Sequence, residues 1–196
     1  ADMINDMTFD NIYHEHVMYY TIHSLINLFN KHEMNVYRVE KIPTHGGSIR
    51  VYISEEIEIQ QSVIELINEE RKNGIDKLQT MEKFNDKLQN NINEIRELFE
   101  RLNKENKKIF GYGAPAKATT ALNFFGISNE IDCIIEDNKL KHGKFLPGMK
   151  IPIISKENIK GKPDYALVLA WNFLEEIKKK NSDLVHKFIS IKDLEI

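Results

Sequence analysis

The fold of the second half of the chain is decided by one short stretch, Ile109-Phe110-Gly111-Tyr112-Gly113-Ala114-Pro115-Ala116-Lys117. Two apolar residues lead into a loop with two glycines, and the residues that follow, 118–125, have the pattern of a helix. Gly111-x-Gly113-x-x-Ala116 matches G-x-G-x-x-[G/A], a pattern found where a strand turns directly into a helix. Pro115 suits the first helical turn, because the amide hydrogen that proline lacks would have no partner there. The stretch therefore predicts a strand, a tight turn and a helix.

The rest of this half repeats the same alternation. Strands are predicted at 131–135, 165–170 and 188–191, and a helix at 174–180. Strands that alternate with helices form a parallel sheet with helices on its faces. We therefore predict an α/β fold in which residues 106–196 form a Rossmann-like domain with a mainly parallel sheet.

Residues 55–105 are predicted to form a helical connector. Apolar residues recur every seven positions at Met81, Leu88, Ile95 and Leu102, which indicates one long helix or two helices separated near Gly74. An apolar stripe at this spacing is typical of packing, so no chemistry is assigned to it.

Residues 1–54 have a mixed α/β pattern. Thr21 is placed to cap a helix over 22–29, and Asn35 to end it in the left-handed conformation. Segments 36–41 and 48–53 have strand character and are joined by a turn, which predicts an antiparallel hairpin. Two residues of this hairpin, His45 and Arg50, are candidates for contact with an anionic group.

The side chains best suited to catalysis lie near the start of the sequence, in Phe9-Asp10-Asn11-Ile12-Tyr13-His14-Glu15-His16. A general base needs a pKa near the working pH, and an unperturbed imidazole has a pKa of about 6.5. In an extended segment Tyr13 and Glu15 would share one face, and His14 and His16 the other. This pattern indicates proton transfer beside a carbonyl group. A polar strand end without chemistry would have the same composition.

A metal site is the third interpretation of the two histidines. Zinc sites need three or four ligands, and neither the H-E-x-x-H spacing nor a pair of cysteines occurs. We predict no metal.

The glycine-rich loop has two interpretations. Glycines let backbone amides approach a diphosphate at a helix N-terminus, and Lys117 would add a positive charge. Glu136 and Asp137 follow at the separation where a ribose ligand is found in dinucleotide-binding domains. A tight turn also needs glycine for steric reasons alone. We predict that Gly111, Gly113 and Lys117 contact a phosphate or diphosphate of the substrate rather than complete a redox cofactor site.

Bulk composition excludes several classes of protein. The 27 Lys and Arg and 30 Asp and Glu residues give a net charge of −3, so nucleic acid is not an expected partner. A single cysteine, Cys133, excludes an intramolecular disulfide and fits a reducing compartment. The longest strongly apolar run, 165–174, is too short to span a membrane. These observations predict a cytoplasmic protein.

Four motifs in order along the chain resemble those of the S-adenosylmethionine-dependent sugar C-methyltransferase family. They are Phe9-Asp10-x-Ile12-Tyr13-His14-Glu15-His16, Thr44-His45-Gly46-Gly47-Ser48-x-Arg50-Val51-Tyr52, Gly111-Tyr112-Gly113-Ala114-x-Ala116-Lys117 and Leu146-Pro147-Gly148-x-x-Ile151-Pro152-Ile153. Members of this family transfer a methyl group to a carbon of a nucleotide-linked ketosugar.

The resemblance implies an order of domains and a set of roles. Residues 1–54 would be the C-terminal part of a class I methyltransferase domain, 55–105 the connector and 106–196 the C-terminal domain. It implies that His16 removes a proton beside the ketone, with Tyr13 and Glu15 orienting the groups or stabilising the enolate oxygen. It also implies that Gly111, Gly113 and Lys117 lie near the nucleotide diphosphate. His14, His45 and Arg50 are further predicted contacts of the substrate.

The family's zinc cysteines and cofactor-binding loop do not occur in this sequence. We therefore expect a C-terminal fragment that packs against a missing N-terminal methyltransferase half and is inactive without it. The alternative is a non-catalytic Rossmann-like module that binds a nucleotide or NAD. A further alternative is an interaction protein built around the helical middle.

Overall fold

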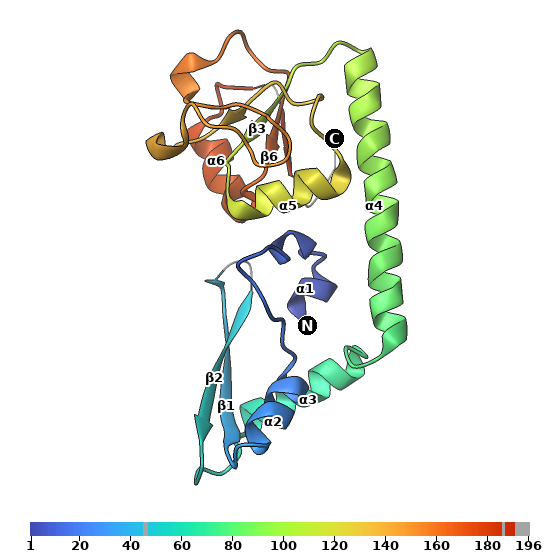
Figure 1. Cartoon of the computed structure of the whole chain (residues 1–196), viewed down its shortest axis with the longest axis vertical. Coiled ribbons are helices and arrows are strands. Elements are labelled where there is room, and N and C mark those ends of the chain that lie inside the picture. Colours follow the sequence, from blue (N-terminus) through green and yellow to red (C-terminus); the bar gives the residue numbers. More distant parts are fainter. Residues whose placement is uncertain (45–46, 186, 191–196) are drawn as a thin grey trace. The chain divides into compact units, whose positions relative to one another are not determined.

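The computed structural model describes residues 1–44, 47–185 and 187–190 and confirms the predicted α/β class (Figure 1). The helices are α1 (Asp2–Asn5), α2 (Ile22–Asn30), α3 (Gln61–Lys72), α4 (Leu78–Lys104), α5 (Ala116–Phe125) and α6 (Leu174–Lys180). The strands are β1 (Asn35–Ile42), β2 (Ser48–Ser54), β3 (Ile109–Tyr112), β4 (Ile134–Ile135), β5 (Ile153–Ile154), β6 (Tyr165–Val168) and β7 (Lys187–Ser190). Short 3₁₀ turns are η1 (Phe9–Asn11), η3 (Lys139–Lys141), η4 (Lys156–Asn158) and η5 (Trp171–Phe173).

The chain divides into two compact units. Unit 1 contains Ala1–Thr8 and Glu15–Lys87, and unit 2 contains Phe9–His14 and the described residues from Leu88 onward. The segment Phe9–His14 therefore packs with residues that lie far away in the sequence. These units are defined by contacts within the chain and do not test family domain boundaries. The domain ranges 1–54, 55–105 and 106–196 therefore stay a prediction.

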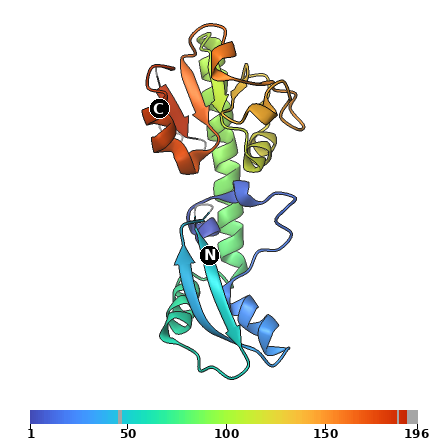
Figure 2. The same cartoon turned by 90° about the vertical axis from the view of Figure 1, so that its left-hand side faces the viewer.

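Unit 1 consists of the antiparallel pair β1–β2 with α2 and α3 packed on it (Figure 2). Its core is formed by apolar side chains from three of these elements: Ile22, Val36, Val39, Val63 and Leu66. A two-stranded sheet alone is at best marginally stable in water, so these contacts hold the hairpin in place.

The start of α2 confirms the predicted cap. The Thr21 side chain accepts from the backbone N–H of Ser24, and the Ser24 hydroxyl lies 3.0 Å from the backbone nitrogen of Thr21, which completes a capping box. The predicted end of this helix is wrong. The left-handed conformation is found at Glu33 (φ 58°), whereas Asn35 begins β1 opposite Ser54.

A buried carboxylate of α3 gives a second cap to α2. Both oxygens of Glu70 accept from the backbone N–H of Ile22, at 2.9 and 3.1 Å. Replacing Glu70 with alanine should lower the free energy of unfolding by about 1–3 kcal/mol, because a buried donor loses its partner. Urea unfolding would measure this. The neighbouring Glu69→Ala change removes only an exposed ion pair with Lys41 and should cost less than about 1 kcal/mol.

The predicted helical region consists of two helices, α3 and α4, with Gly74 between them in the left-handed conformation (φ 62°). The apolar rows of α4 are buried at Leu88, Ile92, Ile95, Phe99 and Leu102, which confirms their packing role there. Met81, the first residue of the predicted row, is exposed.

Unit 2 contains a parallel sheet with the strand order β5-β4-β3-β6-β7. On one face, Phe110, Tyr112 and Val168 pack with Ile177 of α6. Because side chains alternate along a strand, Ile109 and Gly111 point to the opposite face. Strands β4 and β5 have only two residues each, so β4 is shorter than the predicted strand 131–135.

This strand order places a crevice at a defined point. From β3 the chain passes outward through β4 to β5, then returns to the other side of β3 to form β6. The connections that follow the neighbouring strands β3 and β6 therefore lead to opposite sides of the sheet. In open α/β sheets, ligands bind in the crevice between two such connections, beyond the carboxyl ends of the strands. Helix α5 begins there. Its other end is fixed by Arg96 of α4, whose Nε donates to the Phe125 carbonyl at 2.9 Å.

Candidate functional site

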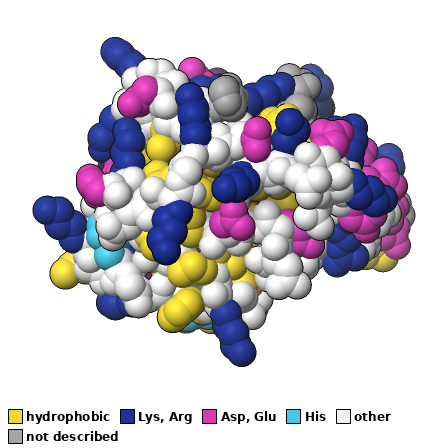
Figure 3. All heavy atoms as spheres, turned by 90° about the horizontal axis from the view of Figure 1, so that it is seen from above, with side chains coloured by type: hydrophobic (Ala, Val, Ile, Leu, Met, Phe, Trp, Pro, Cys, Tyr) yellow, Lys and Arg dark blue, Asp and Glu magenta, His cyan; other side chains and the backbone are white. Residues whose placement is uncertain are grey.

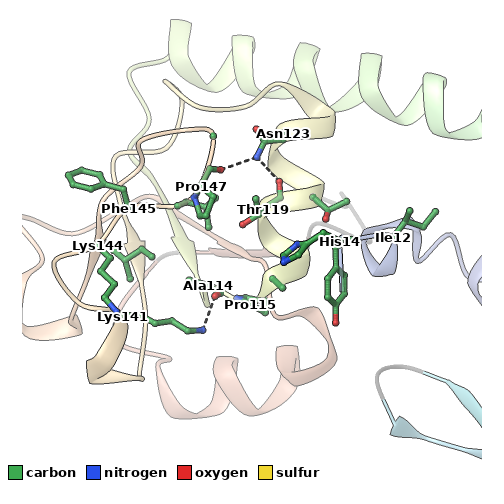
Figure 4. A pocket seen from close by; sticks show the side chains of 16 residues that line it. Ile12, His14, Ala114, Pro115, Thr119, Asn123, Lys141, Lys144, Phe145 and Pro147 are labelled. Carbon is green, nitrogen blue, oxygen red and sulfur yellow. Dashed lines mark hydrogen bonds between the residues drawn. The ribbon is translucent and has the colours of Figure 1, made fainter. Parts of the chain in front are cut away.

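A cavity of about 700 Å³ in unit 2, called the large cavity below, opens beside the start of α5 (Figure 4). Its floor is formed by Ala114–Ala116 and by the α5 side chains Thr119, Thr120 and Asn123. One wall is the loop 144–148 between β4 and β5, and another is the N-terminal segment Ile12–His14. This volume is in the range of small-molecule binding sites.

The cavity combines apolar surface with a few polar groups. Lys144 and His14 are exposed and line it, and the ring of Phe145 lies at its rim with 61% of its surface exposed. Lys141 is held in place because its Nζ donates to the Ala114 carbonyl at 2.8 Å. The site therefore offers lysine ammonium groups and an imidazole to an anion, and an aromatic face to a planar ring.

The position of the loop 144–148 is fixed by contacts with α5. The Asn123 Nδ2 donates to the Thr119 carbonyl at 2.8 Å and to the Pro147 carbonyl at 3.1 Å (Figure 4). Gly148 has φ 81°, and a Cβ there would lie 2.4 Å from the Asn123 Oδ1. A side chain at this φ would be strained and would displace the Asn123 amide from its two carbonyl partners, which accounts for the glycine of the Leu146-Pro147-Gly148 motif.

The glycine-rich loop after β3 has its backbone amides already paired. The Gly111 N–H donates to the Cys133 carbonyl, the Gly113 N–H to the Ile135 carbonyl, and the Ala114 N–H to the Glu136 Oε2 at 2.8 Å. A Cβ on Gly113 (φ 84°) would lie 2.9 Å from the Ala170 Cβ. These contacts occupy the amides of Gly111, Gly113 and Ala114 within the protein and give the glycines a steric role.

Two acidic residues after β4, Glu136 and Asp137, form hydrogen bonds with the end of β3 and the loop that follows it. Burial opposes ionisation of Glu136, but backbone N–H donors from Asn138 and Ala114 and the charge of Lys141 outweigh it, so its pKa is lowered. Burial and the neighbouring Asp137 carboxylate, which accepts from the Tyr112 hydroxyl at 3.0 Å, raise the pKa of Tyr112 to about 12. Gly113, Glu136 and Asp137 line a smaller cavity of about 330 Å³ on the α6 side.

The predicted catalytic residues are divided between the two units. Tyr13 and His14 belong to unit 2 and line the large cavity, whereas Glu15 and His16 belong to unit 1. The His16 side chain is half-buried, and its ring lies 6.3 Å from that of Tyr19. Their chemical roles stay predictions.

Of the predicted hairpin residues, Arg50 is exposed on β2, 3.7 Å from the Glu40 carboxylate. His45 lies outside the described residues.

Lys117 lies outside the lining of the large cavity, in a cluster that the sequence did not reveal. Its Nζ lies 4.1 Å from the centre of the Trp171 ring and donates to the Asn172 Oδ1. The Trp171 Nε1–H donates to the Asp10 Oδ2 at 2.6 Å. Burial raises the pKa of Asp10, while the Trp171 hydrogen bond and the Lys117 charge oppose that shift. Burial also lowers the pKa of Lys117.

Three further observations describe the surface, the helices and the ligating groups. Basic and acidic side chains are interspersed on the face seen in Figure 3. Within the described ranges, no helix is long and apolar enough to cross a membrane. The same residues contain no group of three or more His, Cys, Asp or Glu side chains that could hold a metal ion.

The parallel sheet, its strand order and the cavity at its carboxyl edge define a Rossmann-like α/β domain. The chain belongs to a C-methyltransferase family, because residues 43–190 match the model of the C-methyltransferase C-terminal domain. It is 38% identical over 182 residues to the C-methyltransferase NovU of Streptomyces niveus. The match covers 90% of this chain and 43% of NovU, so the chain spans less than half the length of this relative.

Proposed function

We propose that the chain is the C-terminal part of an S-adenosylmethionine-dependent C-methyltransferase that acts on a nucleotide-linked ketosugar. The family match and the similarity to NovU support methyl transfer to carbon. The four sequence motifs support a nucleotide sugar as the substrate. In this proposal the chain needs the methyltransferase half of the protein for activity.

The large cavity of unit 2 is proposed to hold the nucleotide part of the substrate. The observation that carries this assignment is the combination of Lys144, His14 and the exposed Phe145 ring around a volume of about 700 Å³. Cationic donors bind phosphate oxygens, and an aromatic face stacks on a base. Thr119 and Thr120 supply hydroxyl groups on the floor. Lys117, Gly111, Gly113, His45 and Arg50 stay predicted contacts of the substrate.

The proposed reacting groups are Tyr13 and the two residues that follow His14 in the sequence. His16, two residues beyond His14, takes the proton from the sugar carbon beside the ketone, and the electron pair of the broken C–H bond forms an enolate. Tyr13 donates a hydrogen bond to the enolate oxygen, and Glu15 orients the imidazole.

The methyl donor is not placed on the glycine-rich loop. The glycine-rich loop after β3 has its amides bonded to the protein itself, so no step is assigned to the cofactor here. In the complete protein, S-adenosylmethionine would bind to the part that corresponds to the rest of NovU. Side chains of Val17, Met18, Tyr19 and Tyr20 are 44–82% exposed in unit 1, and they are proposed to pack against that part.

Titration calorimetry of this chain with dTDP, NAD and S-adenosylmethionine tests the proposal. Binding of dTDP without binding of NAD or S-adenosylmethionine is the expected result. Tight binding of NAD would instead favour the non-catalytic module, although the Glu136 contact with the Ala114 amide argues against it. Failure to bind dTDP would remove the nucleotide from this cavity.

The Lys144→Ala variant should weaken dTDP binding by about 10-fold, because a charge-assisted contact with a phosphate is lost. Calorimetry gives the dissociation constant directly. Lys139→Ala is the matched control, since Lys139 is exposed in η3 and does not line the cavity. Equal effects of the two changes would mean that only net charge matters and would contradict a specific phosphate site.

A further inference from the structure

The segment Phe9–His14 forms a cavity wall although it has almost no regular structure. Beyond the three-residue turn η1, residues Ile12–His14 belong to no helix or strand. Ordering such a segment costs conformational entropy that no ladder of backbone bonds offsets. Its position in unit 2 must therefore depend on side-chain anchors.

One anchor is apolar. Phe9 is only 9% exposed, and its ring lies 4.8 Å from that of Phe124 and 5.3 Å from that of Phe125, at the end of α5. The T-shaped contact with Phe125 is one of the preferred geometries of aromatic pairs. This contact holds the beginning of the segment but lies four residues before Tyr13.

The other anchor is polar and buried. Asp10 is 4% exposed and accepts the indole N–H of Trp171 at 2.6 Å. Trp171 begins η5 directly beyond β6, so this bond ties the segment to the loop on the other side of the crevice. Lys117 supplies the positive charge nearby, with its ammonium group over the same indole ring. The hydrogen-bond donor and the positive charge offset the cost of burying the Asp10 carboxylate, so the carboxylate can act as an anchor.

We propose that Asp10 is a positioning residue, which acts through Trp171 to hold Tyr13 and His14 in place as a wall of the cavity. The inference rests on the proposed function only in naming the nucleotide as the ligand. Asp10 does not line the cavity. It would act by fixing the segment from which the chain continues to Glu15 and His16.

Hydrogen exchange of the amides in residues 9–14, measured by mass spectrometry on the whole chain, tests this anchor without any ligand. Asp10→Ala and Trp171→Phe should each accelerate this exchange by about 10- to 100-fold, the range for a lost hydrogen bond to a charged group. The double variant should exchange no faster than either single variant, because both remove the same bond. Asp10→Asn should exchange within about threefold of the original chain, since an amide oxygen can accept the same indole N–H.

The same variants report on binding. Asp10→Ala and Trp171→Phe should raise the dissociation constant for dTDP by about 10-fold, and Asp10→Asn should restore it. Glu175→Ala, which removes an exposed carboxylate on α6, is the control and should leave exchange and binding unchanged. Unchanged exchange in residues 9–14, or acceleration over all of unit 2 alike, would overturn the inference. If the original chain does not bind dTDP, the nucleotide assignment fails. The hydrogen-exchange result still tests whether Asp10 anchors residues 9–14.

Discussion

Replacing His16 with asparagine is expected to lower the turnover of the complete methyltransferase by about 100-fold or more. Asparagine keeps hydrogen-bonding capacity but cannot take a proton at neutral pH, so the enolate would form without a general base. The proposed substrate is activated only by its ketone, which makes this proton transfer hard to replace. Steady-state assays with a saturating nucleotide sugar measure the effect.

The control for this experiment is a histidine outside the proposed site. His32 is exposed in the turn after α2, and His32→Asn should leave turnover within about twofold of the original protein. Both variants should keep the dTDP affinity of the cavity in unit 2, because neither residue lines it. A near-normal rate for His16→Asn would remove His16 from the mechanism.

Replacing Gly113 with alanine should lower the free energy of unfolding of unit 2 by about 2–5 kcal/mol. The new Cβ would lie 2.9 Å from the Ala170 Cβ at the end of β6, in a buried turn with φ 84°. A left-handed alanine costs about 1–2 kcal/mol and overpacking about 1–3 kcal/mol more. Chemical unfolding, followed by the fluorescence of Trp171, the single tryptophan of the chain, measures the loss.

The Gly143→Ala variant is the control that distinguishes backbone strain at a positive φ from a steric clash of the new Cβ. Gly143 has a similar φ of 75°, but a Cβ there meets nothing within 4 Å, so this change should cost only about 1–2 kcal/mol. If Gly113→Ala retained the original stability and abolished dTDP binding, the glycine would serve a ligand rather than the turn. That outcome would favour the diphosphate interpretation of the loop.

Much of the fold was predictable because the relevant signals are local. Thr21 with Ser24, the apolar rows of α4, and the strand-turn-helix at Gly111 each act within a few residues. The end of α2 was not predictable from Asn35, because pairing with Ser54 drew that residue into β1. Strands β4 and β5 are short because each pairs over two residues only, which is a property of the sheet rather than of either segment.

The candidate site was only partly predictable. Tyr13 and His14 do line the large cavity, and the Leu146-Pro147-Gly148 motif marks the loop that closes it. Lys144 and Phe145 were missed although they adjoin that motif, since one exposed lysine and one phenylalanine carry no signal by themselves. The cluster around Lys117 was not predictable because it joins distant parts of the sequence. Asp10 and Trp171 are 161 positions apart, and no sequence periodicity indicates such a contact.

That separation has a consequence for how the polypeptide is made and dissected. A contact between residues 161 positions apart raises contact order and cannot form until Trp171 has been synthesised. A piece cloned to begin at Leu88 would lack the Phe9 ring that contacts Phe124 and Phe125 and the Asp10 carboxylate that accepts from the Trp171 indole. Such a truncation should be aggregation-prone during expression, whereas adding residues 9–14 back as a synthetic peptide should restore its solubility.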